Sequence, residues 1–249
     1  MAVPRHLNNA PIREGLIDVH FEPAVSLDSL DRFAASLADT FPRKSQLWQI
    51  AMGVDLKTGR EAPTSSSQRS ATGVRLESEP QGYVMLARTT GFTFSRLAPY
   101  RDWDELRGVA KPLWDKFVEM VQPRTVTRSA VRYINLLPLP YPFADFSEYL
   151  NAAPMVPLNL PQSLSAFVQR VVMVEQATNR CAIVTQALEE SQASIQPGTV
   201  GIFLDIDTFK VMRADADDAQ VWGTLDSLRE FKNTIFFEHI TEKAAALFE

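Results

Sequence analysis

The sequence predicts an α+β protein in which an antiparallel sheet carries its helices on one face. One observation behind this prediction is that the same order of elements, β-α-β-β-β-α, appears in residues 1–124 and again in residues 125–249. Another is that the strand-like runs alternate apolar and polar residues, whereas the two longest helical runs carry an apolar stripe at spacings of three and four. Elements that are apolar on one side become stable by packing those sides together. We therefore expect a tandem duplication whose two repeats pack as one folding unit.

The first repeat opens with a strand at 14–21 and a helix at 26–40. Ile17 and Val19 lie on one face of the strand because of the two-residue period. The helix has an apolar stripe, and Pro42 prevents it from continuing. We expect the stripe to pack on the apolar face of the strand.

Four further elements complete the first repeat. The last of them is a helix that contains Pro112. This proline implies either that the helix kinks or that two shorter helices meet there. Gly91 indicates a bulge or bend in a long strand. In chain order we expect a strand at 47–56, a mobile polar loop at 57–72, a hairpin with arms at 73–79 and 83–97, and a long helix at 102–121.

The second repeat follows the same order but is interrupted by prolines. Six prolines between residues 138 and 161 predict an extended connector that is not regular helix. Cys181 lies in an alternating apolar run, which favours a buried structural thiol. The expected elements are a strand at 128–137, a short helix at 143–151, strands at 167–176, 181–189 and 200–211, and a last helix whose stripe runs from 221 to 236.

Charge and composition disfavour several classes of function. The net charge of −5 and the isoelectric point near 5.4 argue against a nucleic-acid surface, which needs a basic face. The single cysteine rules out a disulfide framework or a thiolate zinc site within one chain. Residues 1–10 have no signal-peptide core, and no run approaches the ~20 apolar residues of a membrane span. We expect a cytoplasmic protein that contacts neither membrane nor nucleic acid.

Asp205 and Asp207 form the sharpest local pattern for chemistry. They lie two residues apart in a predicted strand, so their carboxylates point the same way, as the hard oxygen ligands of a divalent cation would. No third ligand is identifiable in the sequence. We therefore expect a solvated or ion-paired strand face and no bound metal.

Arg132 lies in a strand whose neighbours are of core type. An arginine there is costly unless it is paired or faces a cavity, and Asp205 or Asp207 on another strand would be a suitable partner. We expect Arg132 to be buried and paired. In the alternative, Arg132 faces a cavity and binds an anionic or polar ligand together with Tyr133 and Asn135.

His20 shares a strand face with Asp18 and Glu14, which suggests an acid–base cluster. No serine, threonine or cysteine nucleophile accompanies it in a recognisable motif, so a surface or interface histidine is the expected role. The glycines form neither a dinucleotide fingerprint nor a phosphate loop. No cofactor is expected.

Several short motifs are specific as a set and span nearly the whole chain. They are Asn9-Ala10-Pro11-Ile12 with Glu14, Leu97-Ala98-Pro99-Tyr100 with Trp103, Val131-Arg132-Tyr133-Ile134-Asn135, and Asp205-Ile206-Asp207. This set resembles a sporadically distributed bacterial family of uncharacterised proteins of about this length. Members often carry a basic residue where this chain has Leu136, so a role that needs that charge is not expected here. The resemblance implies no established reaction.

These observations favour a non-enzymatic cytoplasmic binding or protein-interaction protein, which presents the open sheet face or the groove between repeats to a protein partner or small ligand. The distribution of the resembled family implies a regulatory or neutralising partner in a mobile or defence-linked gene pair. One alternative is a metal-dependent enzyme that acts on a phosphorylated or nucleotide-like substrate through Asp205, Asp207 and Arg132. A second is a nucleic-acid-binding saddle, which the acidic charge disfavours. Self-association into a homodimer is also open.

Overall fold

A nine-stranded antiparallel sheet forms the centre of the protein in a computed structural model, which describes residues 1–55, 64–79, 81–162, 164–189 and 198–249. The strand order is β2-β3-β4-β5-β1-β6-β9-β8-β7. The strands are β1 (Ile12–Glu22), β2 (Arg43–Asp55), β3 (Thr64–Ser78), β4 (Tyr83–Arg88), β5 (Gly91–Leu97), β6 (Thr125–Pro140), β7 (Val168–Glu175), β8 (Arg180–Leu188) and β9 (Thr199–Asp215). The helices are α1 (Leu27–Ala35), α2 (Trp103–Val121), α3 (Ala219–His239) and α4 (Glu242–Ala245), with 3-10 turns η1 (Phe146–Glu148) and η3 (Ala246–Phe248).

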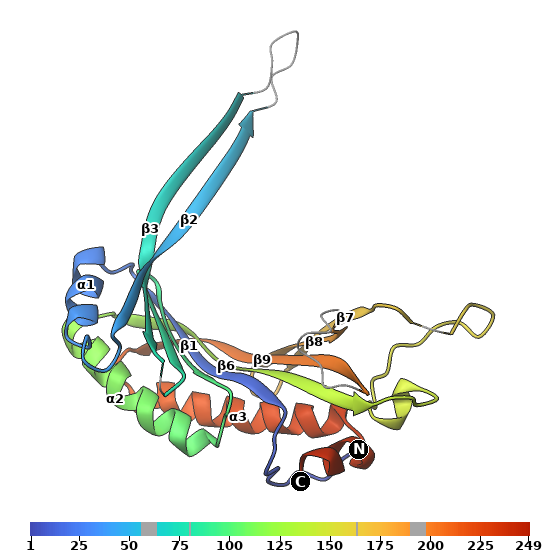
Figure 1. Ribbon diagram of the computed structural model, residues 1–249. Helices are drawn as coiled ribbons and strands as arrows, with labels where there is room; N and C mark the ends of the chain where they lie inside the picture. The colour runs from blue at the N-terminus through green and yellow to red at the C-terminus, as the bar shows by residue number, and fades with distance from the viewer. Residues whose placement is uncertain (56–63, 80, 163, 190–197) are drawn as a thin grey trace.

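The long helices pack on the same face of the sheet, and the other face is open over its central strands (Figure 1). α2 contacts β1 and β5, whereas α3 contacts β6 and β9. α1 lies beside α2 and β3. The expected mixed α+β architecture with an antiparallel sheet is confirmed. None of the described helices is long and apolar enough to cross a membrane.

The core fills the space between the sheet and its helices. Under the first half of the chain, Ile17 and Val19 are buried together with Phe33 of α1 and Phe117 of α2. The Phe117 ring lies 5.1 Å from the Phe33 ring at an interplanar angle of 88°, an edge-on contact that adds to simple burial. The stripe of α1 is buried in this core, but α1 contacts mainly β3 and α2 rather than β1, the strand on which we expected it to pack. A second apolar cluster lies under the other half, between β6, β8, β9 and α3.

The predicted polar loop at 57–72 is wrong over its described part. Residues 64–72 belong to β3, which pairs with β2 from Asp55 opposite Thr64 to Arg43 opposite Glu77. The rest of that segment lies outside the described residues. The β2–β3 hairpin extends away from the body of the protein (Figure 1). In β3, residues 68–70 are polar and exposed, so this stretch lacks the apolar alternation of a core strand and its sequence resembles a loop.

The long hairpin arm predicted at 83–97 is two strands, β4 and β5. They pair with each other up to Arg88 opposite Gly91, so the chain reverses at this point and the predicted bulge is absent. A Cβ added to Gly91 would lie 3.2 Å from the Arg88 guanidinium and 3.3 Å from the Val19 carbonyl oxygen. Glycine at this position therefore relieves a close approach at the start of β5.

Proline positions bear on two of the predicted elements. α2 is one continuous helix that contains Pro112, with Asp102 as its N-cap, so of the two alternatives the pair of shorter helices is excluded. Pro138 and Pro140 belong to β6 and pair with β9, so the extended connector begins later than predicted. The Leu136 amide donates to the Pro11 carbonyl on the side of β6 that faces β1. The backbone nitrogens of residues 138 and 140 point to the same side, beyond the end of β1. A missing N–H on that side breaks no ladder hydrogen bond.

Two smaller predictions also fail. The helix expected at 143–151 is a single 3-10 turn, η1, capped by the Asp145 side chain. Cys181 is only half-buried, because its partner across the ladder is Phe209 and both lie on the face opposite the helices.

We expect that neither residues 1–124 nor residues 125–249 fold alone. Separating them would remove the ladder between β1 and β6 and expose two interior sheet edges with their apolar underside. The test is to express each half and the intact chain, and to follow urea unfolding by circular dichroism. The intact chain should unfold cooperatively and each half should aggregate. A half that stays soluble and unfolds cooperatively would contradict this prediction.

Candidate functional site

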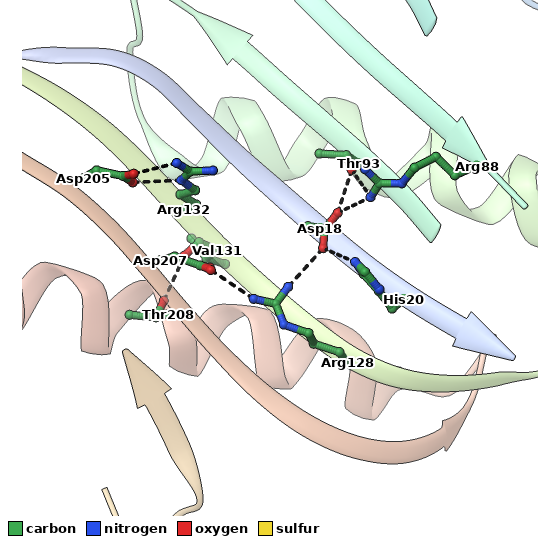
Figure 2. Close-up of polar contacts among 10 residues, drawn as sticks. All are labelled: Asp18, His20, Arg88, Thr93, Arg128, Val131, Arg132, Asp205, Asp207 and Thr208. Carbon is green, nitrogen blue, oxygen red and sulfur yellow. Dashed lines mark hydrogen bonds and ion pairs between the residues drawn. The ribbon is translucent and has the colours of Figure 1, made fainter. Parts of the chain in front are cut away.

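Charged side chains from three adjacent strands meet on the open face of the sheet (Figure 2). β1, β6 and β9 are neighbours in the order of the sheet, and alternate residues of each strand point away from the helices. The charged residues that these strands contribute are Asp18 and His20 from β1, Arg128 and Arg132 from β6, and Asp205 and Asp207 from β9.

Asp18 is the centre of this cluster and is 9% exposed. Arg88 Nη2 and Thr93 Oγ1 each donate to Asp18 Oδ1 at 2.6 Å. On the other oxygen, Arg128 Nη1 donates to Oδ2 at 3.1 Å, and His20 Nε2 lies 2.9 Å from it. One buried carboxylate thus connects β1 to β4, β5 and β6.

These contacts decide the charge of Asp18. Burial by itself raises the pKa of the carboxyl, but the hydrogen bonds from His20 and Thr93 and the charge of Arg88 lower the pKa to about 2. Asp18 is therefore ionised at neutral pH and holds two arginines in place.

Two more ion pairs extend the cluster across β9. Arg128 Nη2 donates to Asp207 Oδ2 at 3.0 Å, and burial raises the pKa of Asp207 despite this contact. Arg132 donates to Asp205 through Nε at 2.8 Å and Nη2 at 2.5 Å, a bidentate pair. The expected partner of Arg132 is confirmed. Its expected burial is wrong, since the side chain is 43% exposed.

The carboxylates of Asp205 and Asp207 do point to the same face, and each contacts an arginine. Within the described ranges, no group of three or more His, Cys, Asp or Glu side chains is placed to hold a metal ion. The arrangement is an ion-pair network in which each acid has a basic partner.

Tyr133 and Asn135 do not join this network. They alternate with Arg132 along β6, so they lie on the helix side of the sheet, where Tyr133 is 1% and Asn135 2% exposed. Asn135 donates to the Leu204 carbonyl at 2.8 Å. The six residues that the sequence singles out therefore fall into two places, with Arg132, Asp205, Asp207 and His20 on the open face.

Tyr133 and Asn135 line a cavity of about 350 Å³ on the helix side. Its walls come from the N-terminal segment, the start of α2, β6 and α3. Tyr100 and Tyr133 share a hydrogen bond of 2.5 Å between their hydroxyl oxygens. A Cβ on Gly15 would lie 2.9 Å from both rings, so glycine leaves the room in which this pair packs.

Lys232 of α3 also lines the cavity and is 7% exposed. Its Nζ lies 3.8 Å from the centroid of the Tyr133 ring, and burial together with the nearby charge of Arg229 lowers the pKa of the lysine to about 7. Lys232 is not among the residues that the sequence patterns singled out. A signal was present, because Lys232 follows Leu228 by four residues and precedes Phe236 by four, within the apolar stripe.

No protein-family model and no curated protein matches the chain.

We expect Asp18→Asn to destabilise the protein by about 2 kcal/mol at pH 7, since one pKa unit corresponds to about 1.4 kcal/mol. The folded pKa lies below the unfolded value of 3.8, so this stability is present above pH 3.8 and is lost as the pH falls through about 2. Urea unfolding of parent and variant should therefore converge in acid. The exposed Asp115→Asn is the matched control, with a loss of at most about 0.5 kcal/mol. A difference between Asp18→Asn and parent that does not change with pH would refute the linkage.

We expect Lys232→Met to stabilise the protein at neutral and acidic pH. The folded pKa of about 7 lies below the unfolded 10.5, so the unfolded chain binds more protons between these values and the parent gains stability as the pH rises. The advantage of methionine should be complete below pH 7 and should shrink towards pH 10.5. Thermal unfolding of both proteins across this range measures it. Lys111→Met, on an exposed face of α2, should show no such trend.

Proposed function

We propose that this protein is a non-enzymatic binding protein that holds an extended segment of a partner protein along β7 and the adjoining open face. The observation that carries the proposal is the exposure of β7, the last strand of the sheet, which pairs only with β8 in the described part of the chain. Four of its eight residues are exposed valines: Val168 (77%), Val171 (40%), Val172 (56%) and Val174 (62%).

The position of these valines favours strand addition. Val172 pairs with Ile183 and Val174 with Cys181, which lies on the open face, so these two valines share that face with the ion-pair network. An edge strand offers unpaired N–H and C=O groups to another chain. Exposed apolar side chains beside such an edge supply the pockets and burial that give a bound strand its affinity and specificity.

Two segments extend from the body, the β2–β3 hairpin and the connector that precedes β7 (Figure 1), and both carry exposed apolar side chains. Trp48 (48%) and Ile50 (64%) lie on β2, in the hairpin at one end of the sheet. Met155 (93%) and Leu158 (91%) lie in the connector that precedes β7. Exposed apolar surface that is spread over separate segments suits a protein partner better than a small molecule.

The strand order supports a proposal about the origin of this surface. Outward from β1 and β6, the order is β5, β4, β3 on one side and β9, β8, β7 on the other. We infer a tandem duplication of units 1–124 and 125–249 whose symmetry axis runs between β1 and β6. The β2 strand then covers the edge of β3 in the first unit, and β7 is the equivalent edge that a partner would cover. On the sequence expectations, we place this binding in the cytoplasm.

We expect peptides as long as β7 and rich in β-branched and aromatic residues to bind the purified protein. A phage-displayed peptide library selects them, and hydrogen exchange of the complex should show protection of β7 amides. The double variant Val172→Lys, Val174→Lys should weaken binding at least tenfold, which is about 1.4 kcal/mol. Val3→Lys is the matched control, because Val3 is 66% exposed and lies outside β7.

Two outcomes would count against the proposal. Peptides that bind the double variant as well as the parent would place the partner elsewhere. Sedimentation that shows a dimer of the parent and a monomer of the double variant would mean that a second copy of this chain covers β7.

A further inference from the structure

The cavity on the helix side contains two basic side chains that have no acidic partner. Lys232 and Arg229 both line it, and within the described residues neither forms an ion pair or a hydrogen bond. Arg5 and Arg101, which also line it, are paired with carboxylates of Glu242 and Glu105, among others. Among the lining arginines and lysine that the structure describes, the two that lack a carboxylate partner both come from α3, and His6 lines the same cavity.

The acidic residues that line the cavity do not neutralise the charges of Lys232 and Arg229. Asp102 is the carboxylate among the lining residues, and it caps α2 by accepting from the Glu105 amide at 2.7 Å. Two cations without a counter-ion in a poorly solvated place are costly, so the lysine loses its proton or an anion enters. The lowered pKa of Lys232 reflects this cost, through burial and the nearby charge of Arg229.

The tyrosine pair adds a donor to the same place. Burial raises the pKa of Tyr100 and of Tyr133, so both hydroxyls keep their protons at neutral pH. One hydroxyl donates to the other across 2.5 Å, which leaves the second proton for a further acceptor. Lys232 lies against the Tyr133 ring, so the ammonium and the hydroxyl pair border the same space.

We propose that this cavity binds a small organic anion, whose carboxylate or phosphate group is held by Lys232, Arg229 and the Tyr100–Tyr133 hydroxyl pair. The apolar part of the ligand would lie against Trp103, Phe236 and Ile12, which line the same cavity. A volume of about 350 Å³ is at the lower end of the range for small-molecule sites, which indicates a compact ligand. This inference does not depend on the proposed role of β7.

The test is isothermal titration of the full-length protein with three probes of similar shape. Benzoate and phenyl phosphate carry the two kinds of anionic group, and benzyl alcohol is the neutral control. At about pH 6, where Lys232 is protonated, at least one anion should bind roughly tenfold or more tightly than benzyl alcohol. The tighter of the two anions identifies the group that the cavity accepts.

Variants then assign the contacts. Lys232→Met and Arg229→Gln should each weaken the preferred anion roughly tenfold, whereas Lys111→Met should bind as the parent does. Circular dichroism shows whether each variant is folded, and the two separate substitutions keep the test decisive if one of them fails to fold.

Three results would overturn the inference. Benzyl alcohol that binds as tightly as the anions would mean a purely apolar cavity. An anion that binds folded Lys232→Met and Arg229→Gln as it binds the parent would lie elsewhere. Failure of both anions to bind the parent at all would leave the cavity without the proposed ligand class.

Discussion

The antiparallel pairing of β1 with β6 is the constraint on which both sites depend. Its register runs from Ile12 opposite Asn135 to Glu22 opposite Thr125. This register brings Arg128 to Asp18 on the open face and puts Gly15 opposite Tyr133 on the helix side. Because side chains alternate along a strand, a slip of one residue would exchange the two faces and destroy both sites at once.

The parts of the fold that the sequence predicts are those where burial forces a pattern. Ile17 and Val19 alternate in β1 because one face packs against α2, and the stripe of α2 follows from the same cause. Residues 68–70 of β3 are exposed and polar, so nothing in their composition distinguishes them from a loop. The reversal between Arg88 and Gly91 lacks the Asn-Gly or Asp-Gly signal of a tight hairpin turn and was therefore missed.

From the sequence, single ion pairs of the candidate site could be predicted but the complete network could not. A charge inside an apolar strand needs a partner, so the contact of Arg132 with Asp205 follows from the sequence. The grouping of Arg132 with Tyr133 and Asn135 was wrong because residues one or three apart in a strand face opposite ways. The partners that complete the network, Arg88 and Thr93 around Asp18, are distant in the chain and could not be found without the strand order.

Gly15 has a consequence for how sequences of this fold can change. The space that its missing side chain leaves is filled by the rings of Tyr100 and Tyr133, which come from two other segments. A larger residue at position 15 is acceptable only if one of these rings becomes smaller, and that change would remove a hydroxyl from the cavity wall. The three positions are therefore expected to evolve as a unit, and a homologue with alanine at position 15 should differ at position 100 or 133 as well.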